Sequence, residues 1–248
     1  MAVSVTAALL VIGDEILSGR TKDKNIGYIA EYLTGIGIDL REVRVVPDVE
    51  EEIVAAVNAL RGRYTYVFTT GGIGPTHDDI TADAIAKAFG VGIDHDPRAV
   101  AMLQERYQPH ELNEARLRMA RIPDGADLVE NPISRAPGFR LGNVFVMAGV
   151  PSIMQAMMDA IAPKLETGAR MTVETVEAEG LAEGIYADGL GQIASAHGGV
   201  SIGSYPSFST SGFRNQIVVR GKDPAAVAGA VAAVRDLLGR LRGDRAPL

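Results

Sequence analysis

TTGGIGPTHDDIT, residues 69–81, is the stretch of this sequence that decides its fold. The apolar residues 64–68 come directly before it and have the composition of a buried strand. Residues 82–89 follow with apolar side chains at helical spacing, and Gly90 is placed to end that helix. Glycines let the backbone approach a ligand closely, and the first turn of a helix offers unpaired N–H donors. A strand that runs through glycines into a helix is therefore typical of a phosphate-binding loop.

Two carboxylates, Asp78 and Asp79, lie within this motif. They would repel a bare phosphate, so they indicate a bridging divalent cation or a base for a bound hydroxyl group. A simpler interpretation is that Asp79 or Thr76 only caps the helix, but capping does not explain three nearby glycines. We therefore predict a ligand site here, in which His77 would bind a metal or a phosphate. The candidate binding residues are Thr70, Gly71, Gly72, Gly74, Pro75, Thr76 and His77.

The composition narrows the classes of protein to which this chain can belong. At 248 residues the chain can form one large domain or two unequal ones. Its 24 basic and 31 acidic residues give a net charge of −7, and the acidic excess lies entirely before residue 169. An acidic surface argues against nucleic-acid binding but suits a metal or a small phosphorylated ligand. The absence of cysteine excludes disulfides, thiolate nucleophiles and Cys-ligated zinc.

Several familiar signatures are missing from the sequence. Residues 1–12 are apolar but too short to span a bilayer and lack signal-peptide flanks, so we expect a soluble cytoplasmic protein that does not bind membranes. There is no Walker loop, Rossmann glycine fingerprint or Gly-x-Ser-x-Gly elbow. The histidines outside the motif lack the spacing of a zinc site, and we interpret them as structural: His95, His110 and His197.

Strands and helices alternate through the first two-thirds of the chain. Strands are predicted at residues 7–12, 40–46, 64–68 and 144–147. Helices are predicted at residues 25–33, 82–89, 98–107, 111–121 and 152–165. A further helix is predicted to begin at Asp48, with Glu51 in a capping-box pattern. This alternation predicts an α/β domain at residues 1–168, with a three-layer, doubly wound and mostly parallel sheet.

The pattern changes near residue 170. The predicted elements are a strand at 171–178, a helix at 184–197, a β-hairpin of 200–205 and 216–220 around the Ser-rich loop 207–212, and a closing helix at 225–241. The order βαββα predicts a small α+β domain at residues 169–248. This second segment contains no pattern that indicates chemistry.

The first strand ends in a second polar group, the segment GDEILSG at residues 13–19. Loops at the carboxyl ends of neighbouring strands share one crevice in a doubly wound sheet. If the first and third strands are adjacent, these carboxylates meet the Asp78–Asp79 pair, and together they require Mg²⁺ or a similar hard cation. The alternative is a solvated acidic turn in which Ser18 or Asp23 is a cap. The candidate residues are Gly13, Asp14, Glu15 and Ser18.

Two later turns also adjoin predicted strands or helices: Asn131-Pro132 with residues 136–139 flanks a loop before a strand, and residues 148–152 connect a strand to a helix. Either turn could bind an anion through backbone N–H groups. Taken alone, each is slightly better explained as an ordinary turn. The candidate residues in these turns are Pro137, Gly138 and Ser152.

Taken together, the motifs resemble the molybdopterin-binding (MoaB/Mog-like) fold, and most closely the N-terminal domain of the CinA family of competence/damage-inducible proteins. Residues 13–19 are similar to that family's Gly-x-Glu-Leu-Leu-x-Gly segment, and residues 70–79 to its Thr-Gly-Gly-Leu-Gly-Pro-Thr-x-Asp-Asp. The later turns match its further landmarks. The resemblance covers residues 5–165 and extends more loosely to residues 201–206, which resemble the pterin-binding-like domain fused to eukaryotic FAD synthases.

The resemblance implies a domain that in some relatives binds molybdopterin and adenylylates it. In other relatives the domain hydrolyses the pyrophosphate of ADP-ribose or FAD with a divalent metal. By this resemblance the motif glycines would cradle a phosphate, and Pro137 and Gly138 would form a second wall. Asp79 matches the motif aspartate of the pterin-binding members, and Asp48 falls where those members have a second acidic residue.

We therefore expect a CinA-type, metal-dependent nucleotide pyrophosphatase in which Asp78, Asp79 and Glu15 are catalytic. Asp78 and Asp79 would hold Mg²⁺, Co²⁺ or Ni²⁺. The alternatives are non-hydrolytic binding of molybdopterin or an adenine nucleotide, a role in molybdenum-cofactor biosynthesis, and a diverged scaffold without activity. The resemblance also implies a homo-oligomer, either a dimer or a trimer. The sequence does not distinguish adenine from pterin recognition.

The chain departs from the family pattern at two positions. His77 stands where many CinA-like chains have lysine, which removes a fixed positive charge beside the phosphates. Ala148 replaces a proline, and we expect this change to be mild. The chain also ends without the amidase region of full-length CinA, so deamidation of a nicotinamide nucleotide is not expected.

Overall fold

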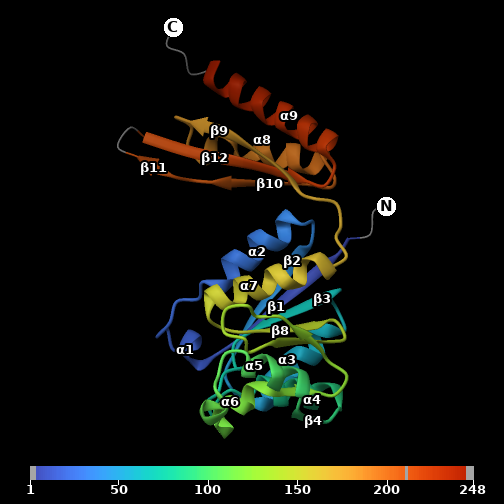
Figure 1. Cartoon of the computed structure of the whole chain (residues 1–248). Coiled ribbons are helices and arrows are strands. Elements are labelled where there is room, and N and C mark those ends of the chain that lie inside the picture. Colours follow the sequence, from blue (N-terminus) through green and yellow to red (C-terminus); the bar gives the residue numbers. More distant parts are fainter. Residues whose placement is uncertain (1–3, 210–211, 244–248) are drawn as a thin grey trace. The chain divides into compact units, whose positions relative to one another are not determined.

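The computed structural model of the chain describes residues 4–209 and 212–243 (Figure 1). The chain divides into two compact units, Met1–Gly168 and Ala169–Leu248. Among the described residues, no helix combines the length and the apolar character that a membrane span requires.

The first unit is built on one six-stranded sheet. Its strands are β1 (Thr6–Ile12), β2 (Asp39–Val46), β3 (Tyr66–Thr70), β6 (Asp127–Val129), β7 (Gly138–Leu141) and β8 (Val144–Met147). Their order across the sheet is β2-β1-β3-β8-β7-β6. The first four strands in this order run parallel, whereas β7 is antiparallel to both neighbours. The predicted α/β class with a mostly parallel sheet is confirmed.

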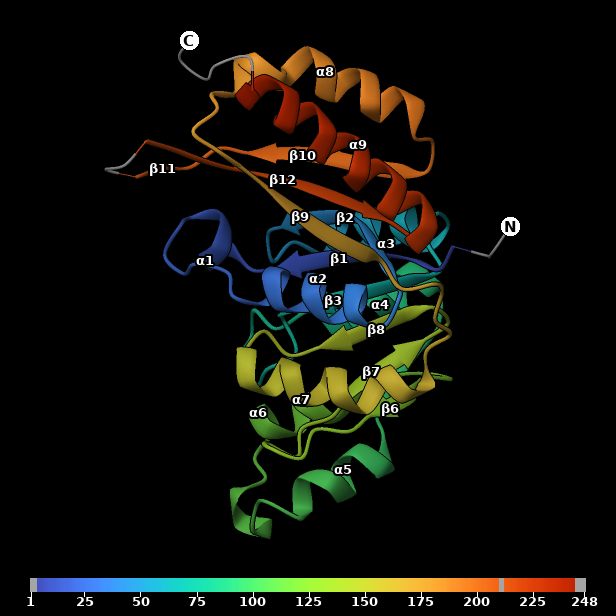
Figure 2. The same ribbon diagram turned by 90° about the horizontal axis from the view of Figure 1, so that it is seen from above.

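Helices cover both faces of this sheet (Figures 1 and 2). The helices are α1 (Asp14–Leu17), α2 (Asn25–Gly35), α3 (Glu50–Arg61), α4 (Thr81–Phe89), α5 (Pro97–Gln104), α6 (Glu114–Leu117) and α7 (Pro151–Ile161). Successive side chains of a strand point to opposite faces. Leu9 therefore packs with the apolar residues of α2 and α7, and Leu10 packs with those of α3 and α4. The three-layer, doubly wound arrangement is confirmed.

Two local predictions are wrong. Asp48 does not open a capping box, because α3 begins at Glu50 without a side-chain cap, and the Asp48 carboxylate accepts the N–H of Asp14 instead (3.0 Å). The single helix predicted at 111–121 is also wrong. There Asn113 caps the short helix α6 by accepting the N–H of Arg116 (2.9 Å), and the chain then enters β5 (Arg121–Pro123), which pairs with β4 (Ile93–His95).

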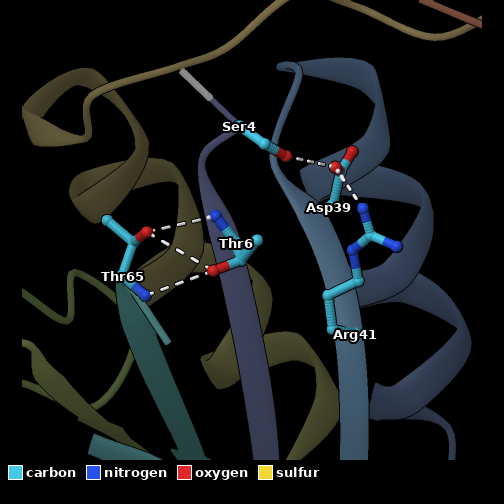
Figure 3. A network of polar contacts seen from close by, with 5 residues as sticks. All are labelled: Ser4, Thr6, Asp39, Arg41 and Thr65. Atoms are coloured by element: carbon cyan, nitrogen blue, oxygen red, sulfur yellow. Dashed lines mark hydrogen bonds and ion pairs between the residues drawn. The ribbon is translucent and has the colours of Figure 1, made fainter. Parts of the chain in front are cut away.

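Hydroxyl and carboxylate groups tie the strands together at their amino ends (Figure 3). Ser4 donates to the carboxylate of Asp39 (2.8 Å), which also pairs with Arg41 (3.2 Å). The hydroxyl of Thr65 accepts the N–H of Thr6 (3.2 Å), and the hydroxyl of Thr6 accepts the N–H of Thr65 (3.4 Å). These contacts join β1 to β2 and to the segment before β3, so they stabilise the alignment of strands whose carboxyl ends meet at the opposite edge.

The second unit is a small α+β domain, as predicted. Its strands are β9 (Thr172–Glu179), β10 (Val200–Tyr205), β11 (Phe208–Ser209) and β12 (Gly212–Gly221), and its helices are α8 (Glu183–Ala196) and α9 (Pro224–Gly243). Antiparallel pairing of β10 with β12 confirms the predicted hairpin, and β9 pairs with the other edge of β12. Val176, Ile217 and Val231 belong to the apolar core of this unit. Residues 210 and 211 of the predicted loop lie outside the described residues.

Candidate functional site

A cleft of about 630 Å³ opens where the parallel strands of the first unit end. Strand β1 lies between β2 and β3, and β3 pairs with β8, so the loops that follow all four strands converge there. The residues that these loops contribute are Gly13, Glu15, Asp48, Gly71, Gly72, Gly74, Pro75, Asp78, Asp79 and Gly149. The volume is within the range of small-molecule sites. The condition that the first and third strands be adjacent is met.

The floor of the cleft is main chain held in close contact. Gly71 has φ 106°, and a Cβ atom there would lie 2.1 Å from the carbonyl oxygen of Ile12. A Cβ atom on Gly149 would lie 3.3 Å from the Cα of Gly71. The N–H of Gly71 already donates to the oxygen of Met147 (3.2 Å). Backbone donors for a phosphate would therefore have to come from residues after Gly71.

The buried residue Thr81 fastens this loop to helix α4. Its hydroxyl donates to the oxygen of Gly71 (3.0 Å), and its N–H donates to the oxygen of Gly72 (3.0 Å). A Cβ atom on Gly72 would lie 2.1 Å from that hydroxyl oxygen. The sequence pattern does not assign this role to Thr81, which stands at the end of the motif.

Four carboxylates, Glu15, Asp48, Asp78 and Asp79, line the cleft. Burial raises the pKa of Asp48 above its ordinary value, and the charges of Asp14, Glu15 and Asp78 raise it further. The hydrogen bond from the Asp14 N–H acts in the opposite direction. The neighbouring carboxylates thus make the electrostatic potential at Asp48 negative, and this potential favours binding of a cation or a proton there.

Replacing Asp48 with asparagine should stabilise the fold at pH 7. A raised pKa means that the folded state disfavours the charged form, and asparagine can still accept the Asp14 N–H through its amide oxygen. Below the ordinary pKa of 3.8 the carboxyl is protonated in both the folded and unfolded states, so the gain should disappear as the pH falls to that value. Urea unfolding of the unmodified protein and the variant from pH 3 to pH 7 measures this gain in stability. A gain that does not change with pH would contradict a raised pKa of Asp48.

Asp79 shapes the loop that carries it. Its Oδ2 atom accepts the N–H (2.8 Å) and the hydroxyl (2.5 Å) of Thr76, and a Cβ atom on Gly74 would lie only 2.6 Å from it. The alternative that Asp79 or Thr76 caps the helix is wrong, because α4 begins at Thr81 without a side-chain cap. The Asp78 side chain is 63% exposed, and a hydrogen bond with the Thr76 side chain lowers the pKa of its carboxyl.

The carboxylates fit a hard cation only in combination with a ligand. Within the described part of the chain, no three histidine, aspartate or glutamate side chains are grouped closely enough to hold a metal by themselves. Mg²⁺ is commonly bound by one or two carboxylates together with waters and the phosphates of the substrate. Oxygen donors from Asp78 and Asp79 fit that pattern.

Other predicted binding residues lie outside this lining. The His77 side chain is 99% exposed, and Ser18 and Ser152 are also exposed. Gly138 is buried in β7, where a Cβ atom would lie 2.2 Å from the oxygen of Val146, so its role is to let two strands approach. The predicted residues that do not line the cleft are Asp14, Ser18, Thr70, Thr76, His77, Pro137, Gly138 and Ser152.

A far wall of the cleft comes from residues that the sequence does not single out as binding groups. This far wall consists of Tyr107, Arg116, Met119, Asn131 and Ser134. The buried amide of Asn131 folds the loop by donating to Ser134 (2.5 Å) and to the oxygen of Ala136 (2.8 Å). The Asn131-Pro132 turn was the one local signal for this wall.

Two family matches cover the two units. Residues 8–167 match the family described as a probable molybdopterin binding domain, and residues 171–242 match the family described as FAD synthase, middle domain. The fold and the cleft thus define a MoaB/Mog-like domain protein. Within that class the chain belongs to the CinA-like molybdopterin-binding-domain family.

Individual relatives agree with this assignment. A protein of Aeropyrum pernix is 40% identical over 64% of the chain, which spans 62% of that relative, and one of Caldivirga maquilingensis is 34% identical over 81% of both. A CinA-like protein of Desulfosudis oleivorans is 36% identical, but the match spans 42% of its length. The crystal structure of CinA from Thermoplasma acidophilum, a protein described as of unknown function, has 35% identity and a TM-score of 0.62, covering 65% of this chain and 98% of that one.

Proposed function

We propose that the chain binds a phosphorylated nucleotide in the cleft and hydrolyses its pyrophosphate bond with a divalent metal. The observation that carries this proposal is the convergence of four carboxylates on a main-chain floor at the carboxyl ends of parallel strands. Carboxylates alone would repel a phosphate, whereas a cation held between them would attract it. ADP-ribose and FAD are the substrates to test, and the match of the second unit to the middle domain of FAD synthase supports including FAD.

Each group has a defined task in this reaction. Asp78 and Asp79, with Glu15, would hold the ion, which when bound offsets charge on the scissile phosphate and lowers the pKa of a water. The backbone of residues 72–74 would contact the phosphoryl oxygens. Asp48, with its raised pKa, would take the proton of the attacking water. Water oxygen bonds to one phosphorus, the bridging P–O bond breaks, and the bridging oxygen leaves on the other phosphate.

A second candidate is binding of a molybdopterin-type ligand without hydrolysis. The family match to a molybdopterin binding domain favours it, and so does the apolar part of the lining, which includes Ile73, Met119 and Ile153 beside Tyr107. A flat ring system would be desolvated by such side chains. This candidate requires affinity for a pterin or nucleotide but no turnover.

Turnover measurements separate the two functions. The purified protein should convert ADP-ribose to AMP and ribose 5-phosphate, or FAD to AMP and FMN, when Mg²⁺, Co²⁺ or Ni²⁺ is added. Chelation with EDTA should abolish product formation. The described residues contain no group of three acidic or histidine side chains that could hold the ion tightly by themselves, so EDTA should remove it. Absence of product with every metal, combined with thermal stabilisation by a pterin or nucleotide, would exclude the hydrolase and support the binding function.

A further inference from the structure

The cleft has one cationic side chain among those that the structure describes in its lining. Glu15, Asp48, Asp78 and Asp79 are acidic, and Arg116 on the far wall is the basic exception. The pyrophosphate group of ADP-ribose or FAD carries two negative charges, and together with the four carboxylates of the lining these exceed the charge of one divalent ion. The lysine expected at position 77 is a histidine whose exposed side chain lies outside the lining. A second positive group is therefore needed elsewhere in the cleft.

Arg116 is held in a defined position. Its guanidinium carbon lies 4.3 Å from the centre of the Tyr107 ring, and its Nη1 donates to the oxygen of Glu111 (2.6 Å). Its backbone N–H is fixed by the Asn113 cap (2.9 Å). Stacking on an aromatic ring and one backbone contact reduce the entropy lost when the remaining donors bind an anion.

Within the described ranges, the guanidinium of Arg116 also has no carboxylate partner. Arg98 contacts Asp96 (2.6 Å) and Arg121 contacts Asp83 (2.7 Å), whereas Arg106 and Arg118 donate to main-chain oxygens of Ile133 (2.8 Å) and Asp79 (3.2 Å). Among the described residues, Arg116 forms no ion pair although its cleft holds acidic groups. A guanidinium has five N–H donors, and a single oxygen of Glu111 leaves most of them available to phosphate.

We propose that Arg116 binds one phosphate of the ligand while the carboxylate-held ion binds the other, so that the cleft selects a pyrophosphate over a monophosphate. This inference rests on the proposed function for its ligand class. In this proposal Arg116 binds the ligand and takes no part in the chemical step. Its guanidinium supplies the positive charge that a lysine at position 77 would have supplied. Its expected signature is an effect on diphosphate affinity that is much larger than the effect on monophosphate affinity.

Calorimetric binding with Mg²⁺ tests this inference with α,β-methylene-ADP, which cannot be cleaved between its phosphates, and with AMP. Arg116→Gln should weaken binding of the diphosphate analogue by about 10- to 100-fold and binding of AMP by less than about threefold. Arg116→Lys should retain part of the affinity because it keeps the charge. Arg106→Gln is the matched control, since Arg106 lies 5.9 Å from the same ring and donates to Ile133 but is not in the lining.

Each other outcome has one meaning. Equal losses for AMP and the diphosphate analogue, an equal loss in Arg106→Gln, or no binding of either ligand by the unmodified protein overturns the inference. Thermal unfolding of the variants identifies a general loss of structure. Analogue binding that depends on Arg116, with no cleavage of ADP-ribose or FAD, overturns the proposed hydrolysis and leaves the role of Arg116 intact.

Discussion

Replacing Gly71 with alanine is expected to destabilise the first unit by about 3 kcal/mol or more. The backbone there has φ 106°, which disfavours any side chain, and the new Cβ would lie 2.1 Å from the oxygen of Ile12. That oxygen belongs to the main chain of β1, so it cannot move aside as a flexible side chain would. Hydrogen exchange under increasing urea measures the change, because it follows the amides of β1 and β3 separately from the second unit.

Substitutions at two other glycines distinguish the effect of the steric clash at Gly71 from the effect of its backbone conformation. Gly90 ends α4 at φ 68° with open space around it, so Gly90→Ala should cost only about 1 kcal/mol. Gly27 lies inside α2, also in open space, and Gly27→Ala should stabilise the protein by about 0.5–1 kcal/mol. If Gly71→Ala proves no more harmful than Gly90→Ala, the close approach of Gly71 to the Ile12 oxygen of β1 does not matter to stability.

Replacing Asp79 with alanine should reduce turnover by about 100-fold or more, the scale of losses at metal sites. The change removes a proposed metal ligand and also the acceptor of both hydrogen bonds from Thr76. Asp79→Asn separates these effects, because its amide oxygen can still accept from Thr76 while the charge is lost. The activity of both variants is measured as initial rates of ADP-ribose and FAD hydrolysis at increasing metal concentration. Both variants should lose turnover.

Asp83→Asn provides the matched control for this experiment. Asp83 lies on α4, pairs with Arg121 (2.7 Å) and is not in the cleft lining, so its neutralisation should leave turnover unchanged. Full activity in Asp79→Asn would mean that the carboxylate acts only by shaping the loop. Equal losses in the Asp79 and Asp83 variants would mean that general acidity, rather than this site, supports the reaction.

The sheet was predictable where the sequence carries a strong periodic pattern. Strands β1, β3 and β8 are almost entirely buried, and apolar runs of that kind identify parallel strands. Strands β5, β6 and β7 were not predicted, since they are three or four residues long and include Pro123 and Gly138. Their pairing depends on partners distant in sequence, which a local pattern does not record.

The cleft was predictable on one side only. Glu15 and Asp79 follow strands, and the rule that loops at the carboxyl ends of adjacent parallel strands share a crevice brings them together. The far wall follows no such rule. Arg116 reaches the cleft because Asn113 begins a new helix inside a stretch whose composition favours one long helix. The local pattern around Asp48 predicted the start of a helix, and only the family resemblance predicted an acidic site residue there; its carboxylate lines the cleft and accepts the N–H of Asp14.

The main-chain floor of the cleft has an evolutionary consequence. Gly71 and Gly149 meet without side chains, so the geometry of the floor does not depend on the chemistry of the ligand above it. The far wall is made of side chains on residues 107–134, outside the parallel strands. Substitutions there can exchange one substrate for another without disturbing the sheet. A lineage built on this scaffold can therefore vary the exposed part of this wall while the glycine floor stays the same.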